Sequence, residues 1–122
     1  MSFDKRSYER LPDGSMLACP GFGTSLAARI WSNGTIACVE EMIYTRRIVI
    51  AYPETPFGCW NDVWCFDKAK DIINALREWD YPTVPEPDGW HRHPMSNRRR
   101  IDGDLDREYK NEDEKRRLIP YV

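Results

Sequence analysis

The sequence predicts a small α+β domain, in which an antiparallel sheet of three to five strands carries one amphipathic helix packed across it. Two observations lead to this fold class. Asn33-Gly34 stands between two apolar-rich runs, a spacing typical of a tight β-hairpin. Farther along, apolar residues recur at helical spacing over residues 67–80, which indicates a helix with one apolar stripe.

The predicted hairpin assigns its side chains to two faces. A two-residue type I′ turn at Asn33-Gly34 places Ile30 opposite Ala37. One face is then a core face of small residues: Leu26, Ala28, Ile30, Ala37 and Val39. The other face is mixed and partly exposed: Ala27, Arg29, Trp31, Ile36, Cys38 and Glu40. On this second face, Arg29 is expected to pair with Glu40.

The elements after the hairpin follow from the same patterns. Further strands are expected within 42–52, with a turn near residues 44–46, and at 62–66. Asp67 is a suitable N-cap for the helix, and Tyr81-Pro82 ends it. The apolar stripe of the helix consists of Ala69, Ile72, Ile73, Leu76 and Trp79.

The composition indicates a single domain of 122 residues with reduced thiols. Hydrophobic residues make up 41% of the chain, and the net charge is −2, so electrostatic recognition must come from local clustering. The N-terminus lacks the apolar stretch of a secretory signal, and no apolar run is long enough to span a membrane. We therefore expect a cytoplasmic protein that does not contact membranes.

Four sections are expected along this domain. Residues 1–15 form a polar N-terminal arm, and residues 16–80 form the core of sheet and helix. Residues 81–101 form an extended loop rich in Pro and Arg. Residues 102–122 form a charged tail, whose alternating charges leave room for only a weak amphipathic helix.

The segment 89–100 is the strongest candidate for a binding surface, because it holds both histidines and four arginines but no acidic residue. The candidate binding residues are Trp90, His91, Arg92, His93, Arg98, Arg99 and Arg100. Guanidinium groups donate paired hydrogen bonds to phosphate oxygens, and an aromatic ring stacks on unpaired bases. This pattern predicts contact with nucleic acid or a nucleoprotein. The alternative is that the arginines already pair with the acids downstream: Asp102, Asp104 and Asp106.

The two histidines allow a second interpretation of this segment. In an extended chain His91 and His93 point to the same side, which makes them a workable pair of metal ligands. Further ligands would come from Cys59, Cys65, Asp102 or Asp104. The spacing matches no zinc module, so we expect two surface or hydrogen-bonded histidines, no metal and no cofactor. A Cys–His nucleophile is also disfavoured, since the two cysteines adjoin aromatic residues expected in the core, where thiols are inert.

The aromatic residues are expected to be structural. The set that should pack the helix against the sheet is Trp60, Trp64, Phe66 and Trp79. Trp90 should pin the proline-rich loop to the domain rather than stack on a base.

The second half of the chain, residues 58–109, resembles a group of small uncharacterised proteins from bacteriophages and prophages. The residues that carry this resemblance are Trp64-Cys65-Phe66, a helix ending in Trp79-Asp80, Gly89-Trp90-His91-Arg92-His93-Pro94, Arg98-Arg99-Arg100, Asp102-Gly103-Asp104 and Arg107-Glu108-Tyr109. The resemblance implies an accessory protein of a mobile element that binds host macromolecules, including defence complexes, and an anti-CRISPR role fits the size. It implies no catalytic residues, because no activity is established for that group.

Three hypotheses about function follow. The first is a non-enzymatic phage accessory protein in the host cytoplasm, whose arginine-rich loop contacts nucleic acid or a host nucleoprotein. The second is a protein-only inhibitor or virion component that uses the hairpin face, with Arg29, Trp31 and Ile36. The third is a metal-dependent hydrolase at His91 and His93. The sequence does not predict the oligomeric state.

Overall fold

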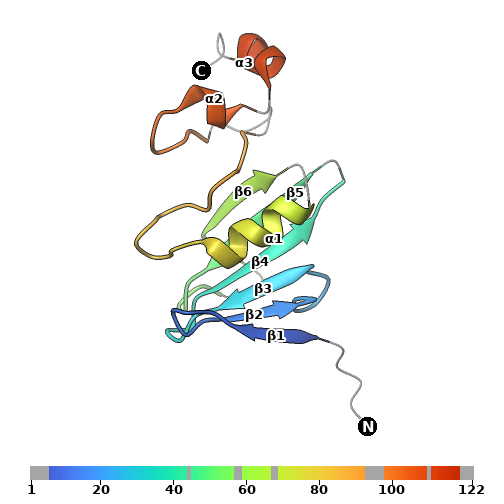
Figure 1. Cartoon of the computed structure of the whole chain (residues 1–122), viewed down its shortest axis with the longest axis vertical. Coiled ribbons are helices and arrows are strands. Elements are labelled where there is room, and N and C mark those ends of the chain that lie inside the picture. The colour runs from blue at the N-terminus through green and yellow to red at the C-terminus, as the bar shows by residue number, and fades with distance from the viewer. Residues whose placement is uncertain are drawn as a thin grey trace.

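An antiparallel sheet of six strands, arranged in chain order, forms the body of the protein (Figure 1). The computed structural model describes residues 6–43, 45–56, 59–66, 69–92, 98–109 and 111–118. The strands are β1 Ser7–Arg10, β2 Met16–Cys19, β3 Ala27–Ile30, β4 Ile36–Glu41, β5 Arg46–Ala51 and β6 Asp62–Phe66. The helices are α1 Ala69–Glu78, α2 Leu105–Glu108 and α3 Glu112–Leu118. The chain is therefore a mixed α+β protein.

The predicted counts of three to five strands and one helix are wrong, because the described residues form six strands and three helices. The additional strand β1 lies in the predicted arm, where it pairs with β2 as an edge strand. All four residues of β1 are exposed. A strand with no buried face shows no alternation of apolar and polar residues, so the sequence pattern did not predict it. The other two helices lie in the predicted tail. There the Asp104 side chain caps α2, and Glu108 and Tyr109 are buried.

The β3–β4 hairpin turns through a longer loop than the predicted type I′ turn. No non-glycine residue in the described segments has a positive φ, so Asn33 does not adopt the conformation that type I′ requires. Instead the Gly34 N–H donates to the Trp31 carbonyl at 3.0 Å, and the Trp31 N–H donates to the Thr35 carbonyl at 2.9 Å. Gly34 alone is left-handed, with φ of 94°. Ile30 therefore pairs with Ile36, one residue away from the predicted register.

This shift reassigns β4 between the two faces of the sheet. Directly paired residues share a face, so Arg29 lies with Ala37 on one side of the sheet. The predicted pair of Arg29 with Glu40 is wrong, because Glu40 lies on the opposite face and pairs there with Arg47 at 2.8 Å.

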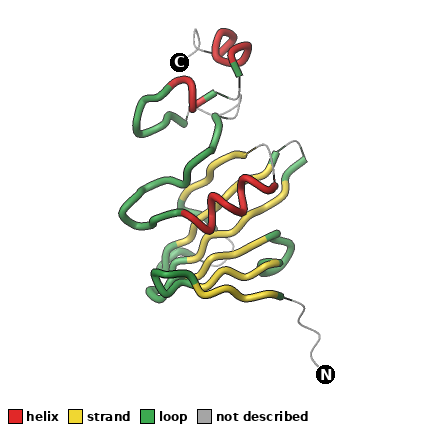
Figure 2. Tube along the Cα trace, viewed as in Figure 1, coloured by secondary structure: helices red, strands yellow, loops and turns green. Residues whose placement is uncertain are grey.

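Helix α1 covers one face of the sheet, as Figure 2 shows, and the main core lies between them. Ile72 and Leu76 of the helix are fully buried against this face. The buried sheet residues on the helix side are Leu17, Ala27, Arg29, Ala37, Val39, Ile48, Ile50, Trp64 and Phe66. No helix in the described segments is long and apolar enough to cross a membrane.

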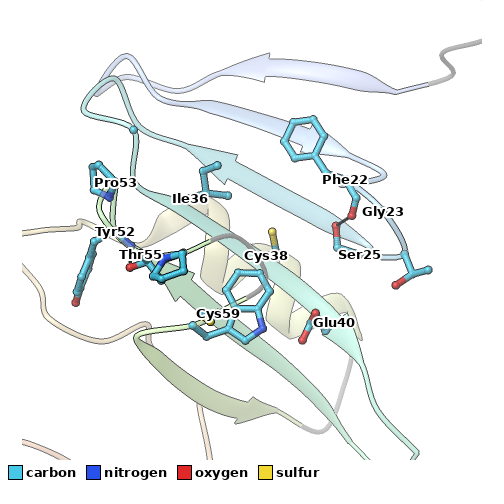
Figure 3. Close-up of a pocket in the computed structure, with 15 residues that line it drawn as sticks. Phe22, Gly23, Ser25, Ile36, Cys38, Glu40, Tyr52, Pro53, Thr55 and Cys59 are labelled. Carbon is cyan, nitrogen blue, oxygen red and sulfur yellow. Dashed lines mark hydrogen bonds between the residues drawn. The ribbon is translucent and has the colours of Figure 1, made fainter.

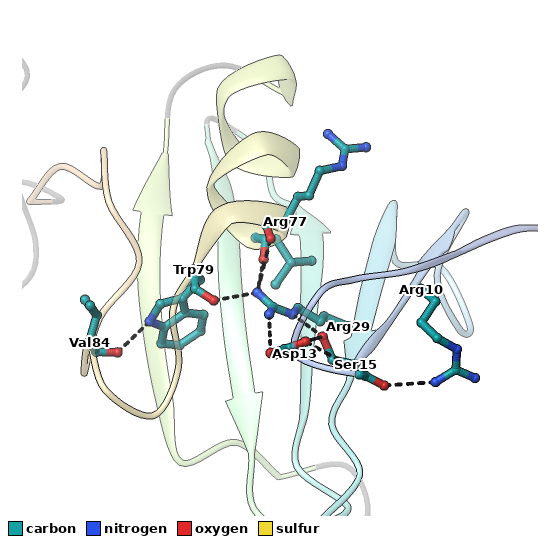
Figure 4. Close-up of polar contacts among 9 residues, drawn as sticks. Arg10, Asp13, Ser15, Arg29, Arg77, Trp79 and Val84 are labelled. Carbon is teal, nitrogen blue, oxygen red and sulfur yellow. Dashed lines mark hydrogen bonds and ion pairs between the residues drawn. The ribbon is translucent and has the colours of Figure 1, made fainter.

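Arg29 joins the sheet to the end of α1 (Figure 4). Its Nη1 donates to the carbonyls of Leu76 at 2.8 Å and Trp79 at 2.6 Å, which would otherwise be left without partners at the helix end. Its Nη2 contacts the Asp13 carboxylate at 2.7 Å, and its Nε donates to Ser15 Oγ at 2.9 Å. Arg29, which the sequence placed on a partly exposed face, is thus buried and connects β3 with the end of α1 and with the turn between β1 and β2.

Candidate functional site

The arginines of the predicted binding segment contact acids of the protein itself. Arg98 reaches β6, where its Nη2 donates to Asp62 Oδ2 at 2.9 Å. Its guanidinium lies 4.7 Å from the ring centroid of Trp64 and 5.5 Å from that of Trp90. Arg98 therefore fastens the segment to the edge of the sheet through both charge and stacking.

Glu108, which is fully buried, gathers three more groups of this segment. Its Oε1 accepts from Arg99 Nε at 3.1 Å and from the Arg100 backbone N–H at 2.8 Å. Arg92 Nη1 lies 3.9 Å from the second carboxylate oxygen and donates to the Tyr109 hydroxyl at 3.1 Å. A buried carboxylate needs such partners, so Arg92 and Arg99 offset the charge of Glu108 inside the protein.

Arg100 and Asp102 form a bidentate pair. The two nitrogen–oxygen distances are 3.0 Å from Nε and 2.9 Å from Nη2. The hydrogen bonds from Arg100 lower the pKa of Asp102 to about 2, and the same bonds raise the pKa of Arg100. Of the three downstream acids that the sequence suggested as partners, Asp102 pairs with an arginine of the run Arg98–Arg100. Asp104 caps α2, and Asp106 pairs with Lys115.

The remaining candidates of this segment have structural surroundings as well. Trp90 is 1% exposed and lies beneath Arg100, whose guanidinium is 5.6 Å from its ring centroid. The His91 N–H donates to the Cys65 carbonyl at 2.9 Å, which extends the edge of the sheet. His93 lies outside the described residues. Within the residues described, no three His, Cys, Asp or Glu side chains gather to hold a metal.

The helix-free face of the sheet carries an apolar groove (Figure 3). Its floor is the outward-facing side of β4, with Ile36, Cys38 and Glu40, together with Ala51 of β5. One wall is the β2–β3 turn and the other is the β5–β6 loop. The wall residues are Phe22, Gly23, Thr24 and Ser25 on one side, and Tyr52, Pro53, Thr55, Pro56, Cys59 and Trp60 on the other. Its volume of about 540 Å³ lies in the range of binding pockets.

Two expectations about this face are wrong. Trp60, expected in the core, is 37% exposed, and Cys59, expected to be buried, is exposed on the same loop. Of the predicted hairpin face, Ile36, Cys38 and Glu40 line the groove, whereas Ala27, Arg29 and Trp31 are buried toward the helix. The groove and the predicted hairpin face thus share three residues, all on β4.

The groove offers contact area rather than chemistry. Burial raises the pKa of the Cys38 thiol on its floor to about 11, so this sulfur stays protonated and unreactive at neutral pH. Among the described residues that line it, Glu40 is the one charged side chain. An exposed aromatic side chain stands on each wall, Phe22 on one and Trp60 on the other. These features suit the capture of an apolar group.

Sequence reasoning missed the groove, although the chain contains two signals for it. The first is Phe22, which stands between Gly21 and Gly23, and the second is Trp60, which follows Pro53 and Pro56 in the β5–β6 loop. Both aromatic residues stand in segments rich in Gly and Pro, where the chain runs over the surface. An aromatic residue in such a loop is a better candidate for binding than one inside a strand.

The chain matches no protein-family model, and no curated protein or solved structure is significantly similar to it.

Proposed function

We propose that this protein is a non-enzymatic accessory protein of a mobile element, which binds a host protein in the cytoplasm through the groove on the helix-free face. A protein of a host defence complex is the class of partner that the proposal favours. The observation that carries the proposal is the division of roles between the two candidate surfaces. Segment 89–100, called the arginine segment from here on, has its arginines in ion pairs with acids of the same chain. The groove, in contrast, leaves apolar side chains accessible.

The contrast in polar contacts supports a protein partner over a nucleic acid. A polyanion site needs guanidinium groups free to meet phosphates, and here the ion pairs with Asp62, Glu108 and Asp102 would have to be replaced. The groove has an aromatic side chain on each wall and a floor that is apolar except at Glu40, which suits the centre of a protein interface. No catalytic residue is part of the proposal.

Capture of a partner from nuclease-treated host lysate tests the proposal, with the full chain as bait. We expect capture to survive nuclease treatment and to fall about 30-fold with Trp60→Ala, the loss typical of a buried aromatic contact of about 2 kcal/mol. Tyr8→Ala is the matched control, because Tyr8 is an exposed aromatic residue of the same sheet face outside the groove. Its capture should equal that of the unmodified protein.

The same experiment includes the variant that would support a polyanion instead. Arg99 is the most exposed arginine of the run Arg98–Arg100, with 49% of its side chain accessible. If capture disappears after nuclease treatment, or is lost in Arg99→Ala and kept in Trp60→Ala, the arginine segment is the binding surface and the proposal is wrong.

A further inference from the structure

We infer that the groove takes an apolar segment of the protein partner that carries a lysine or arginine beside its apolar anchor. This inference rests on the proposed function, and it specifies the chemistry of the partner at the same site. It comes from the distribution of charge around the groove.

The floor of the groove becomes acidic at one end. Ile36 and Cys38 are apolar, and Glu40 follows them on the same face of β4. Arg47 donates to Oε1 of this carboxylate from Nε at 2.8 Å, and its Nη2 lies at the same distance from Oε1. In the described segments Oε2 accepts no hydrogen bond, so it remains available to a donor on an occupant of the groove.

A second acid stands near the opposite end of the groove. Glu54 is exposed and lies between the lining residues Pro53 and Thr55. Within the described residues it forms no ion pair. The described residues that line the groove include no lysine or arginine. Beside them, Arg47 pairs with Glu40, and Arg6 lies over the ring of Phe22 at 5.1 Å. The remaining attraction for a cationic occupant comes from Oε2 of Glu40 at one end and from Glu54 at the other.

The dimensions of the floor limit the length of the bound segment. Successive residues of a strand are spaced by about 3.3 Å, so the floor from Ile36 to Glu40 measures about 13 Å. That distance holds about four residues of an extended peptide or just over two turns of a helix. An apolar anchor over Cys38 would place a neighbouring basic side chain within reach of Glu40.

Three synthetic peptides test this inference, with the complete protein as receptor. Their common sequence is acetyl-Ser-Leu-Trp-Leu-X-Ser-amide, in which X is Lys, Gln or Glu. Binding is followed by the NMR shifts of the backbone amides of Ile36, Cys38 and Glu40. We expect the Lys peptide to bind about threefold more tightly than the Gln peptide and about tenfold more tightly than the Glu peptide, as for a partly exposed ion pair.

A matched pair of variants assigns the preference to one face of β4. Glu40→Gln should abolish the preference for Lys over Gln. Glu41→Gln should keep it, because Glu41 has a similar ion pair, with Arg46 at 3.0 Å, on the opposite face of the same strand. Equal binding of the three peptides, a preference that survives Glu40→Gln, or shifts confined to residues outside the groove would overturn the inference.

The two proposals fail in different ways. If Trp60→Ala abolishes capture of the partner but the peptides show no preference for Lys, only the inference about charge is wrong. If the peptides bind with this preference but capture depends on Arg99, only the proposed function is wrong. Sedimentation of the free protein adds a check, since a dimer that Trp60→Ala dissociates would make a second copy the occupant and overturn the inference.

Discussion

The two faces of the sheet begin from similar alternating apolar side chains but are completed in different ways. On the helix side, large side chains such as Trp64 and Phe66 fill the space below α1, and the buried Arg29 finds partners for each of its nitrogens. On the other face, the central row is built from small residues such as Ala28 and Cys38, with loops at both sides. The helix side therefore supplies most of the buried core. The other face keeps an accessible groove, which we propose as the binding site for a partner.

The largest effect is expected on the covered face. Arg29→Ala should lower the free energy of unfolding by about 3 kcal/mol, because the buried carbonyls at the end of α1 lose their charged donor and the partly exposed Asp13 loses its partner. Arg47→Ala removes a partly exposed ion pair on the open face and should cost within about 1 kcal/mol. Urea unfolding measures both. Equal losses would contradict the proposed difference between the faces.

A smaller loss is expected at the buried carboxylate of α2. Glu108→Gln removes the buried charge that Arg92 and Arg99 share, and should cost about 2 kcal/mol, a typical value for hydrogen bonds to a charged group. The exposed Glu112 serves as the control, since Glu112→Gln should leave the unfolding midpoint unchanged. A neutral effect of Glu108→Gln would mean that the arginines do not depend on this carboxylate.

The turn beside the groove should show an effect of about 1–2 kcal/mol. Gly34 has a positive φ, so Gly34→Ala is strained, and the added methyl group would lie 3.4 Å from Pro53 on the groove wall. Gly14 closes an equivalent turn with a similar φ, but a methyl group there has open space. Both variants should lose stability by thermal denaturation. Only Gly34→Ala should also shift the NMR signals of the groove wall.

The smallest expected effect is on the pH dependence of stability. Asp102 has a folded-state pKa of about 2, below its ordinary value of 3.8, because Arg100 donates hydrogen bonds to it. Its contribution is therefore present above about pH 4 and is lost as the pH falls toward 2. The urea midpoint of Asp102→Asn should depend less on pH across this interval than that of the unmodified protein. Parallel curves would contradict the pairing.

The sequence predicted the mixed fold class and the positions of its apolar runs, because periodicity reflects which side of an element is buried. It did not predict the register of β3 and β4. Asn-Gly suits more than one turn, and a change of one residue in the loop moves β4 to the other face. Tertiary partners explain the remaining errors. Arg29 is buried because a helix end needs donors, and Arg98 is paired because Asp62 lies on β6, 36 residues earlier in the chain. Glu108, on the short helix α2, pairs with Arg99.

Protection of Cys59 in the bound state tests the central claim most directly. Cys59 is exposed and lines the groove, whereas Cys19 lies outside it and is an internal reference. With the captured partner in place, the rate at which N-ethylmaleimide modifies Cys59 should fall at least about tenfold, while Cys19 reacts as in the free protein. An unchanged rate at Cys59 in a complex that Arg99→Ala dissociates would contradict the account and assign binding to the arginine segment.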